Sequence, residues 1–161
     1  MDILTTVSGK MLITLLMSMV PVLELRGAIP IGVSLGLDYR TAIGLSILGN
    51  LIPVPFLILF TRSVFDWLRS QNERLDRFVT RMEERAALKS EIVQRYAFWG
   101  LVLLVAVPLP GTGAWTGSLV AVILKMRLRR AFPAIALGVV VAGLIVAFVT
   151  YGAGALLFAP N

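Results

Sequence analysis

A charged segment, broken by glycine and proline, interrupts the first apolar stretch of the chain. It reads Pro21-Val-Leu-Glu-Leu-Arg-Gly-Ala-Ile-Pro30 and joins apolar runs at 11–23 and 28–37. A helix needs about 20 apolar residues to cross a bilayer, so each run alone reaches only about mid-bilayer. We therefore expect Glu24 and Arg26 inside the membrane, where ionisable groups are costly and by default mark a substrate or ion pathway. The alternative is an ion pair between them that only supports folding.

The composition is that of an integral membrane protein. Of the 161 residues, 58% are hydrophobic and only 15% are charged, whereas soluble domains carry about 25% charged residues. We expect one membrane domain over residues 1–161, surrounded by membrane lipids and small enough to form a homo-oligomer. Orientation in the membrane explains the net charge of +6, so no nucleic-acid partner is expected.

The chain contains no cysteine and no histidine. Zinc sites built on these residues and Ser-His-Asp triads are therefore excluded, and the sequence has no phosphate-binding loop of the ATPase type. We expect no enzyme activity, no cofactor and no metal site. Any active transport must draw on an ion gradient or on a partner.

Most of the apolar runs are too short to cross a bilayer alone. Two are long enough, 41–61 and 131–159, and the others form two pairs: 11–23 with 28–37, and 97–110 with 114–124. Each pair is either a re-entrant hairpin or a broken helix that crosses. Hairpins place twelve Lys and Arg residues on one face and two on the other, whereas full crossing gives nine and five. The positive-inside rule favours hairpins, with residues 62–95 in the cytoplasm.

The two halves of the chain resemble each other. Residues 40–49 align with residues 129–138, matching Arg, Ala, Leu and Gly in register. We interpret the halves as inverted repeats at 8–61 and 96–159, each a re-entrant helical hairpin followed by a transmembrane helix. Such repeats predict a binding site between them, near the midplane of the membrane. Chance similarity between segments rich in Leu, Ala and Gly is the alternative.

Residues 62–95, between the repeats, are charged and rich in arginine. One helical stripe gathers their apolar residues: Leu68, Leu75, Phe78, Val79, Met82 and Ala86. We expect an amphipathic cytoplasmic helical linker with at least one bend, supported by i,i+4 ion pairs such as Glu73 with Arg77. Its stripe could pack on the membrane surface, on the bundle or on another protomer.

Candidate binding residues cluster at the first predicted hairpin tip and in the span that follows it. Gly27 and Pro30 permit the chain reversal, Arg26 suits phosphate or carboxylate groups, and Glu24 can change its protonation. Asn50 falls near mid-membrane. It could contact the substrate or donate a hydrogen bond to a carbonyl of a tip.

The second tip carries no charge but offers backbone amides and hydroxyls. Its candidate residues are Pro108, Gly111, Thr112, Gly113, Trp115 and Thr116. Half-helices that begin near Ala28 and Ala114 would direct partial positive charge to the midplane, which favours an anionic ligand group. The hydroxyls could instead satisfy local backbone groups, and the tryptophan could simply anchor the turn.

Together these motifs resemble the small multidrug export proteins of bacteria and archaea. The motifs are Glu24-Leu-Arg-Gly-Ala-Ile-Pro30, the Gly49-Asn50 pair, the arginine-rich middle and Pro108-Leu-Pro-Gly-Thr-Gly-Ala-Trp115. The resemblance implies a multi-pass exporter of small molecules in a prokaryotic cytoplasmic membrane. Two facing hairpins are also remotely similar to the DedA or VTT-domain superfamily, which is implicated in lipid handling. Members of that superfamily usually carry charges at both hairpins, whereas the second tip here has none.

Three functions follow from these observations. The first is a transporter of small molecules in which Arg26 and the tip amides bind the cargo while Glu24 couples protons. The second is a DedA-like lipid-phosphate translocase or scramblase that uses the same tip. The third is a non-transporting membrane scaffold that acts through the basic linker.

Overall fold

Helices joined by short turns make up the described part of the chain, which contains no strand. The structure, a computed structural model, describes residues 6–87, 90–109 and 112–152. Its elements are α1 (Val7–Met19), α2 (Glu24–Ser34), α3 (Tyr39–Leu51), α4 (Pro53–Gln71), α5 (Glu73–Ala87), α6 (Ser90–Ala106), α7 (Ala114–Ile123), α8 (Leu128–Ala147) and the π-helix η1 (Phe148–Gly152). The all-α class is confirmed, and two continuous stretches, Tyr39–Gln71 and Leu128–Gly152, are long and apolar enough to cross a membrane.

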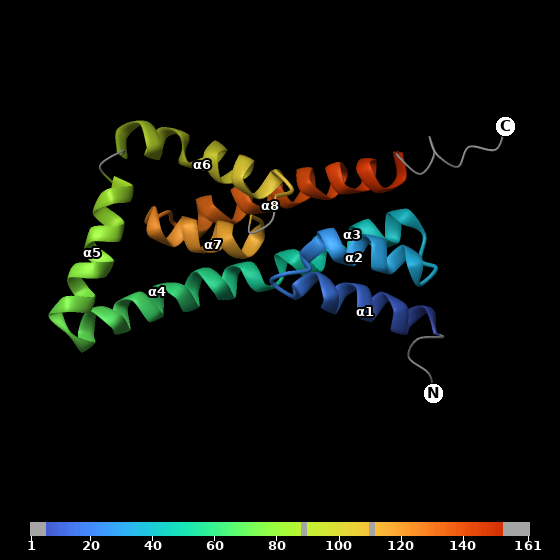
Figure 1. Cartoon of the computed structure of the whole chain (residues 1–161), viewed down its shortest axis with the longest axis horizontal. Helices are drawn as coiled ribbons and strands as arrows, with labels where there is room; N and C mark the ends of the chain where they lie inside the picture. Colours follow the sequence, from blue (N-terminus) through green and yellow to red (C-terminus); the bar gives the residue numbers. More distant parts are fainter. Residues whose placement is uncertain (1–5, 88–89, 110–111, 153–161) are drawn as a thin grey trace.

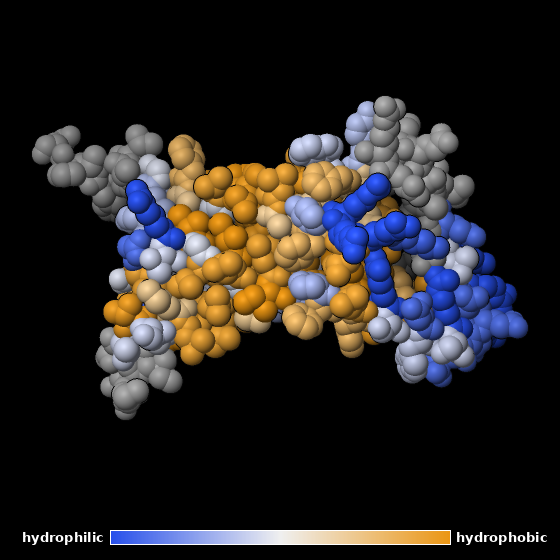
Figure 2. Space-filling view, turned by 180° about the vertical axis from the view of Figure 1, so that it is seen from behind, coloured by the Kyte–Doolittle hydropathy of each residue, from blue (hydrophilic) through white to orange (hydrophobic). Residues whose placement is uncertain are grey.

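Two antiparallel helix pairs face each other within the molecule (Figure 1). The α1–α2 turn and the α6–α7 turn both lie near the middle of its long axis, whereas the α2–α3 and α7–α8 connections lie at opposite ends. The α3–α4 stretch and α8 run along most of the molecule. In the space-filling view, an apolar band occupies the middle and hydrophilic residues gather toward the ends, most of all around α5 (Figure 2).

The first chain reversal differs from the one predicted. Helix α2 begins at Glu24 rather than near Ala28, so Gly27 lies inside a helix and does not form the turn. The reversal falls at residues 20–23, and Pro21 explains it. A proline disfavours helical geometry in the residue before it, and Val20 is indeed extended, with φ −75° and ψ 130°. The second half-helix does begin at Ala114, as predicted.

Helices α2 and α7 end in the same hydrogen-bond pattern. After α2, the Leu37 N–H donates to the Gly32 carbonyl at 3.1 Å, and the Met126 N–H donates to the Ala121 carbonyl at 2.9 Å after α7. Both are Schellman motifs with a left-handed residue before the donor, Gly36 at φ 88° and Lys125 at φ 52°. These positions lie 89 apart, the same offset that relates the two aligned segments.

Close helix packing repeats at the same offset. A Cβ built on Gly49 of α3 would lie 2.4 Å from the Leu15 carbonyl oxygen of α1, and one on Gly138 of α8 would lie 2.9 Å from the Val102 carbonyl oxygen of α6. Only glycine lets these backbones approach so closely. The first helix of each pair therefore packs on the long stretch that follows it.

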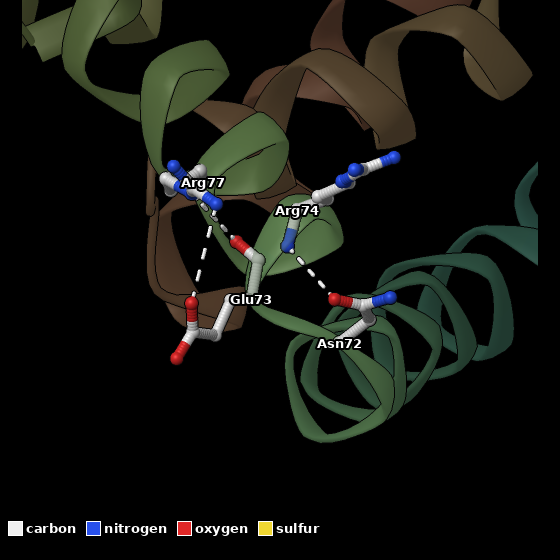
Figure 3. Close-up of polar contacts among 4 residues, drawn as sticks. All are labelled: Asn72, Glu73, Arg74 and Arg77. Carbon is white, nitrogen blue, oxygen red and sulfur yellow. Dashed lines mark hydrogen bonds and ion pairs between the residues drawn. The ribbon is translucent and has the colours of Figure 1, made fainter.

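The arginine-rich segment is bent, as predicted, but its first ten residues extend α4. Asn72 is extended, and its side chain accepts a 3.2 Å hydrogen bond from the Arg74 N–H, so it separates α4 from α5 (Figure 3). The Glu73–Arg77 pair forms at 4.0 Å. Val79 is buried, whereas Leu75 and Phe78 are exposed. The side chains of Met82 and Ala86 lie outside the described residues.

Candidate functional site

Arg26 joins the two turns. Its Nη1 donates to the Leu109 carbonyl, and its Nη2 donates to the Val107 carbonyl at 3.2 Å and to the Thr112 hydroxyl at 3.1 Å. These acceptors follow the last residue of α6, at the end of the helix that carries partial negative charge. The guanidinium of the first pair therefore caps the carboxyl end of a helix in the second.

Glu24 lies on the other side of the turn between α6 and α7, at the beginning of α7. Its side chain is 95% buried, and its Oε1 accepts a 3.4 Å hydrogen bond from the Trp115 N–H in the first turn of α7. Gly113 makes this approach possible, because a Cβ built there would lie 2.0 Å from Glu24 Oε2. A carboxylate at a helix N-terminus satisfies free N–H groups and the positive end of the dipole.

Trp115 ties a third helix end into the cluster. Its indole Nε1 donates a 3.3 Å hydrogen bond to the carbonyl of Met19, the last residue of α1. This anchors the second turn, one of the two roles expected from the sequence. The ends of α1, α6 and α7 thus meet with side-chain partners for their exposed backbone groups, as broken helices require when water is scarce.

The two charges do not pair with each other. Within the described residues, no ion pair joins Glu24 to Arg26, so the folding alternative in the form predicted is not observed. Each charge instead contacts the part of the second turn whose partial charge has the opposite sign. The arrangement can hold the two turns together, and it can come apart if either charge is neutralised or takes another partner.

The remaining residues of the second turn lie around this contact. Thr112 Oγ1 is 2.8 Å from both the Val107 and Leu109 carbonyl oxygens, so it also satisfies local backbone. Pro108 is exposed between those two carbonyls, and Thr116 is half-buried in α7. Gly111 lies outside the described residues.

Asn50 occupies a different environment. It is 99% buried on α3, and neither atom of its amide has a hydrogen-bond partner among the described residues. The predicted bond to a tip carbonyl is therefore not seen. Ser46, one turn earlier on the same buried face, also has an unpartnered hydroxyl.

Sequence reasoning missed the acceptors of the tip contact because they are backbone carbonyls. The Val107, Leu109 and Met19 carbonyls carry no signature in side-chain identity. The available signal was the break between the apolar runs 97–110 and 114–124, since the carbonyl groups at a helix end that is shielded from water need donors. No cluster of three or more Asp, Glu, His or Cys residues that could hold a metal ion occurs in the part of the chain that the structure describes.

Comparison with known protein families gives a match over most of the chain. The family model described as "putative small multi-drug export protein" matches residues 24–145, a range that contains α2, the α6–α7 turn, α5 and most of α8 but not the first turn at residues 20–23. No curated protein and no solved structure matches the chain. The matched range begins at Glu24, the first residue of α2.

Proposed function

The chain belongs to the family of putative small multi-drug export proteins, and from that premise we propose that it exports small molecules across a membrane with Glu24 coupling protons. Its apolar helices and its family make it a membrane protein, and the family name favours a transporter over an enzyme. The proposal of proton coupling rests on one contact. Arg26 binds the end of α6, and Glu24 binds the beginning of α7, on the two sides of the α6–α7 turn.

The proposed topology has two re-entrant hairpins in an inverted repeat, whose tips meet near the membrane midplane. Three observations support it: both turns lie near the middle of the long axis, apolar residues cover that middle on the face shown in Figure 2, and the same helix ends recur 89 residues apart (Figures 1 and 2). In this topology the arginine-rich linker and the α7–α8 loop share the cytoplasmic side, while both termini lie outside.

In the proposed mechanism, the Glu24 carboxylate and the cargo compete for the same donors. When ionised, Glu24 accepts a hydrogen bond from a backbone N–H at the N-terminus of α7. A negatively charged or polar group of the cargo would bind at the same place. Protonation removes the charge and weakens that contact. The α7 amides then become available to the cargo, so proton binding and cargo binding replace the same interaction.

Transport by purified protein in lipid vesicles tests this function. With a pH gradient imposed, wild-type protein should move at least one of two fluorescent probes, anionic fluorescein or cationic ethidium. Glu24→Gln keeps the size of the side chain and removes its titration, so it should abolish the dependence on the gradient. Arg26→Gln should abolish transport itself. Control variants are Glu73→Gln and Arg74→Gln, the same exchanges at exposed positions of α5.

The outcomes separate the competing functions. Provided that the variants fold, transport by Glu24→Gln that still depends on the pH gradient, or full transport by Arg26→Gln, would contradict the proposal. Flipping of a headgroup-labelled phospholipid without probe transport would replace export by lipid translocation at the same contact. Loss of function only when the exposed Leu75 and Phe78 are made polar would favour the scaffold.

A further inference from the structure

Ser46 and Asn50 form a buried polar pair on α3 that the contact between the turns does not use. Both are buried, with 0% and 1% of their surfaces exposed, and they are one helical turn apart on the face that also carries Ala42 and Gly49. Among the described residues, the Ser46 hydroxyl and both amide atoms of Asn50 lack hydrogen-bond partners. Each such group lowers stability when it stays unpaired in an apolar interior.

The free hydroxyl of Ser46 differs from three other buried serine and threonine hydroxyls. Those three donate to a carbonyl of their own helix: Thr14 to Lys10 at 2.9 Å, Ser18 to Leu15 at 2.7 Å and Ser118 to Ala114 at 2.7 Å. This is how serine and threonine usually satisfy themselves inside membrane helices. Ser46 is equally buried and keeps its hydroxyl available for another partner.

The spacing of the pair suits one small bridging group. Side chains at i and i+4 have Cβ atoms about 6 Å apart, so one oxygen placed between them can reach both with ordinary hydrogen bonds. Gly49, next to Asn50, packs against the Leu15 carbonyl and the Ser18 hydroxyl of α1. The neighbourhood is therefore polar as well as buried, which is the setting in which an internal water persists.

The chemistry of the pair selects an uncharged ligand. The Asn50 amide offers a donor and an acceptor, and the Ser46 hydroxyl offers both. A cation would leave the amide N–H groups unpaired, and an anion would leave the amide oxygen unpaired. A hydroxyl group, which donates one hydrogen bond and accepts others, can satisfy both side chains.

The fold does not require polar residues at these positions. At the offset of 89, the counterparts in α8 are Ile135 and Val139, and both are fully buried. The same packing position in the second half is thus filled by apolar side chains. The helices can therefore pack at this position without polar side chains, so packing alone does not explain Ser46 and Asn50.

We propose that Ser46 and Asn50 bind one uncharged hydroxyl group inside the bundle. The hydroxyl comes from a water molecule or from a bound alcohol. The site is separate from the Glu24–Arg26 contact and does not depend on transport.

Solid-state NMR of the full chain in lipid bilayers tests the site. The chain has three asparagines, so a sample with 15N in the asparagine side chains gives few signals, and the Asn50→Leu spectrum assigns the one of interest. Magnetisation transfer from water to the Asn50 amide reports a bound water. Benzyl alcohol is the alcohol probe, and toluene is its control because it lacks the hydroxyl. Asn72, on the surface, is the internal reference.

Ser46→Ala and Ser118→Ala are the matched variants. Ser46→Ala should shift the Asn50 amide signals, whereas Ser118→Ala removes an equally buried hydroxyl that already has a partner and should leave them unchanged. Water transfer in the absence of alcohol supports a resident water. In a sample that shows no magnetisation transfer from water, a shift of the Asn50 amide signals with benzyl alcohol but not with toluene supports a bound alcohol. The proposal is overturned if the Asn50 amide shows neither magnetisation transfer from water nor a shift with benzyl alcohol. It is also overturned if the Asn50 amide signals are unchanged by Ser46→Ala.

Discussion

Replacing Gly113 with alanine tests the contact between the two turns at its tightest point. The new Cβ would lie 2.0 Å from Glu24 Oε2 and 2.5 Å from Oε1, so the carboxylate must leave the N-terminus of α7. Gly113 also has a φ of 143°, which a residue with a side chain rarely adopts. The substitution therefore combines backbone strain with the loss of a charge-assisted hydrogen bond.

The two effects have similar expected sizes. A strained φ costs about 1–3 kcal/mol, and a hydrogen bond to a charged group contributes about 1.5–3 kcal/mol. Gly36→Ala isolates the strain, since Gly36 also has a positive φ, of 88°, but a Cβ there would meet only Lys10 Nζ, at 3.6 Å. Gly113→Ala should exceed Gly36→Ala by about 2 kcal/mol in the free energy of unfolding.

Melting of the purified protein in mild detergent measures this difference. For a chain of this length, 1 kcal/mol corresponds to roughly 2–4 °C, so Gly113→Ala should melt about 4–8 °C below Gly36→Ala. In a Glu24→Ala background the clash is absent, and Gly113→Ala should cost no more than Gly36→Ala. An equal cost of Gly113→Ala with and without the Glu24 side chain would refute the reasoning.

Two further predictions concern helix packing and capping. Gly49→Ala places a Cβ 2.4 Å from the Leu15 carbonyl oxygen, and should lower the free energy of unfolding by about 3 kcal/mol or more. In Gly44→Ala the new Cβ meets nothing within 4 Å, so this variant should raise the free energy of unfolding by up to about 1 kcal/mol. Equal melting temperatures of the two variants would contradict the close packing of α1 on α3. Hydrogen bonds from Thr41 hold the pKa of the Asp38 carboxyl below its usual value. The stability that this cap adds should be present above about pH 4 and fall away as the pH drops through the lowered pKa, a loss that Asp38→Asn should not show in melting curves from pH 6 to pH 2.

Local chemistry in the sequence predicted part of the fold. Run length and hydropathy predicted helices throughout and the two long stretches, and the glycine before Ala114 marked the start of α7. The predicted start of α2 is wrong, because Gly27 and Pro30 lie inside the helix and do not form the turn. Pro21 makes the turn instead, and the helix accommodates Pro30 in its interior.

The partners of the site residues could not be read from the sequence. The sequence placed Glu24 and Arg26 together, and pairing between them was the simplest local outcome. Their actual partners are more than 80 positions away, and most are backbone groups exposed by a break in another helix. Such contacts depend on how the two pairs meet, which local patterns do not encode. The lack of a hydrogen-bond partner for Asn50 could not be predicted either, since it depends on how the helices pack around its amide.

Sidedness of the chain tests the central claim, that two re-entrant hairpins bring the turns together inside the membrane. The sequence has no cysteine, so single-cysteine variants need no prior removal of native thiols. Impermeant thiol reagents applied to sealed, oriented vesicles should label Arg77→Cys and Arg127→Cys from the same side and Arg40→Cys from the other. Labelling of Arg77→Cys and Arg127→Cys from opposite sides would mean that the second pair crosses the membrane, and it would contradict the account.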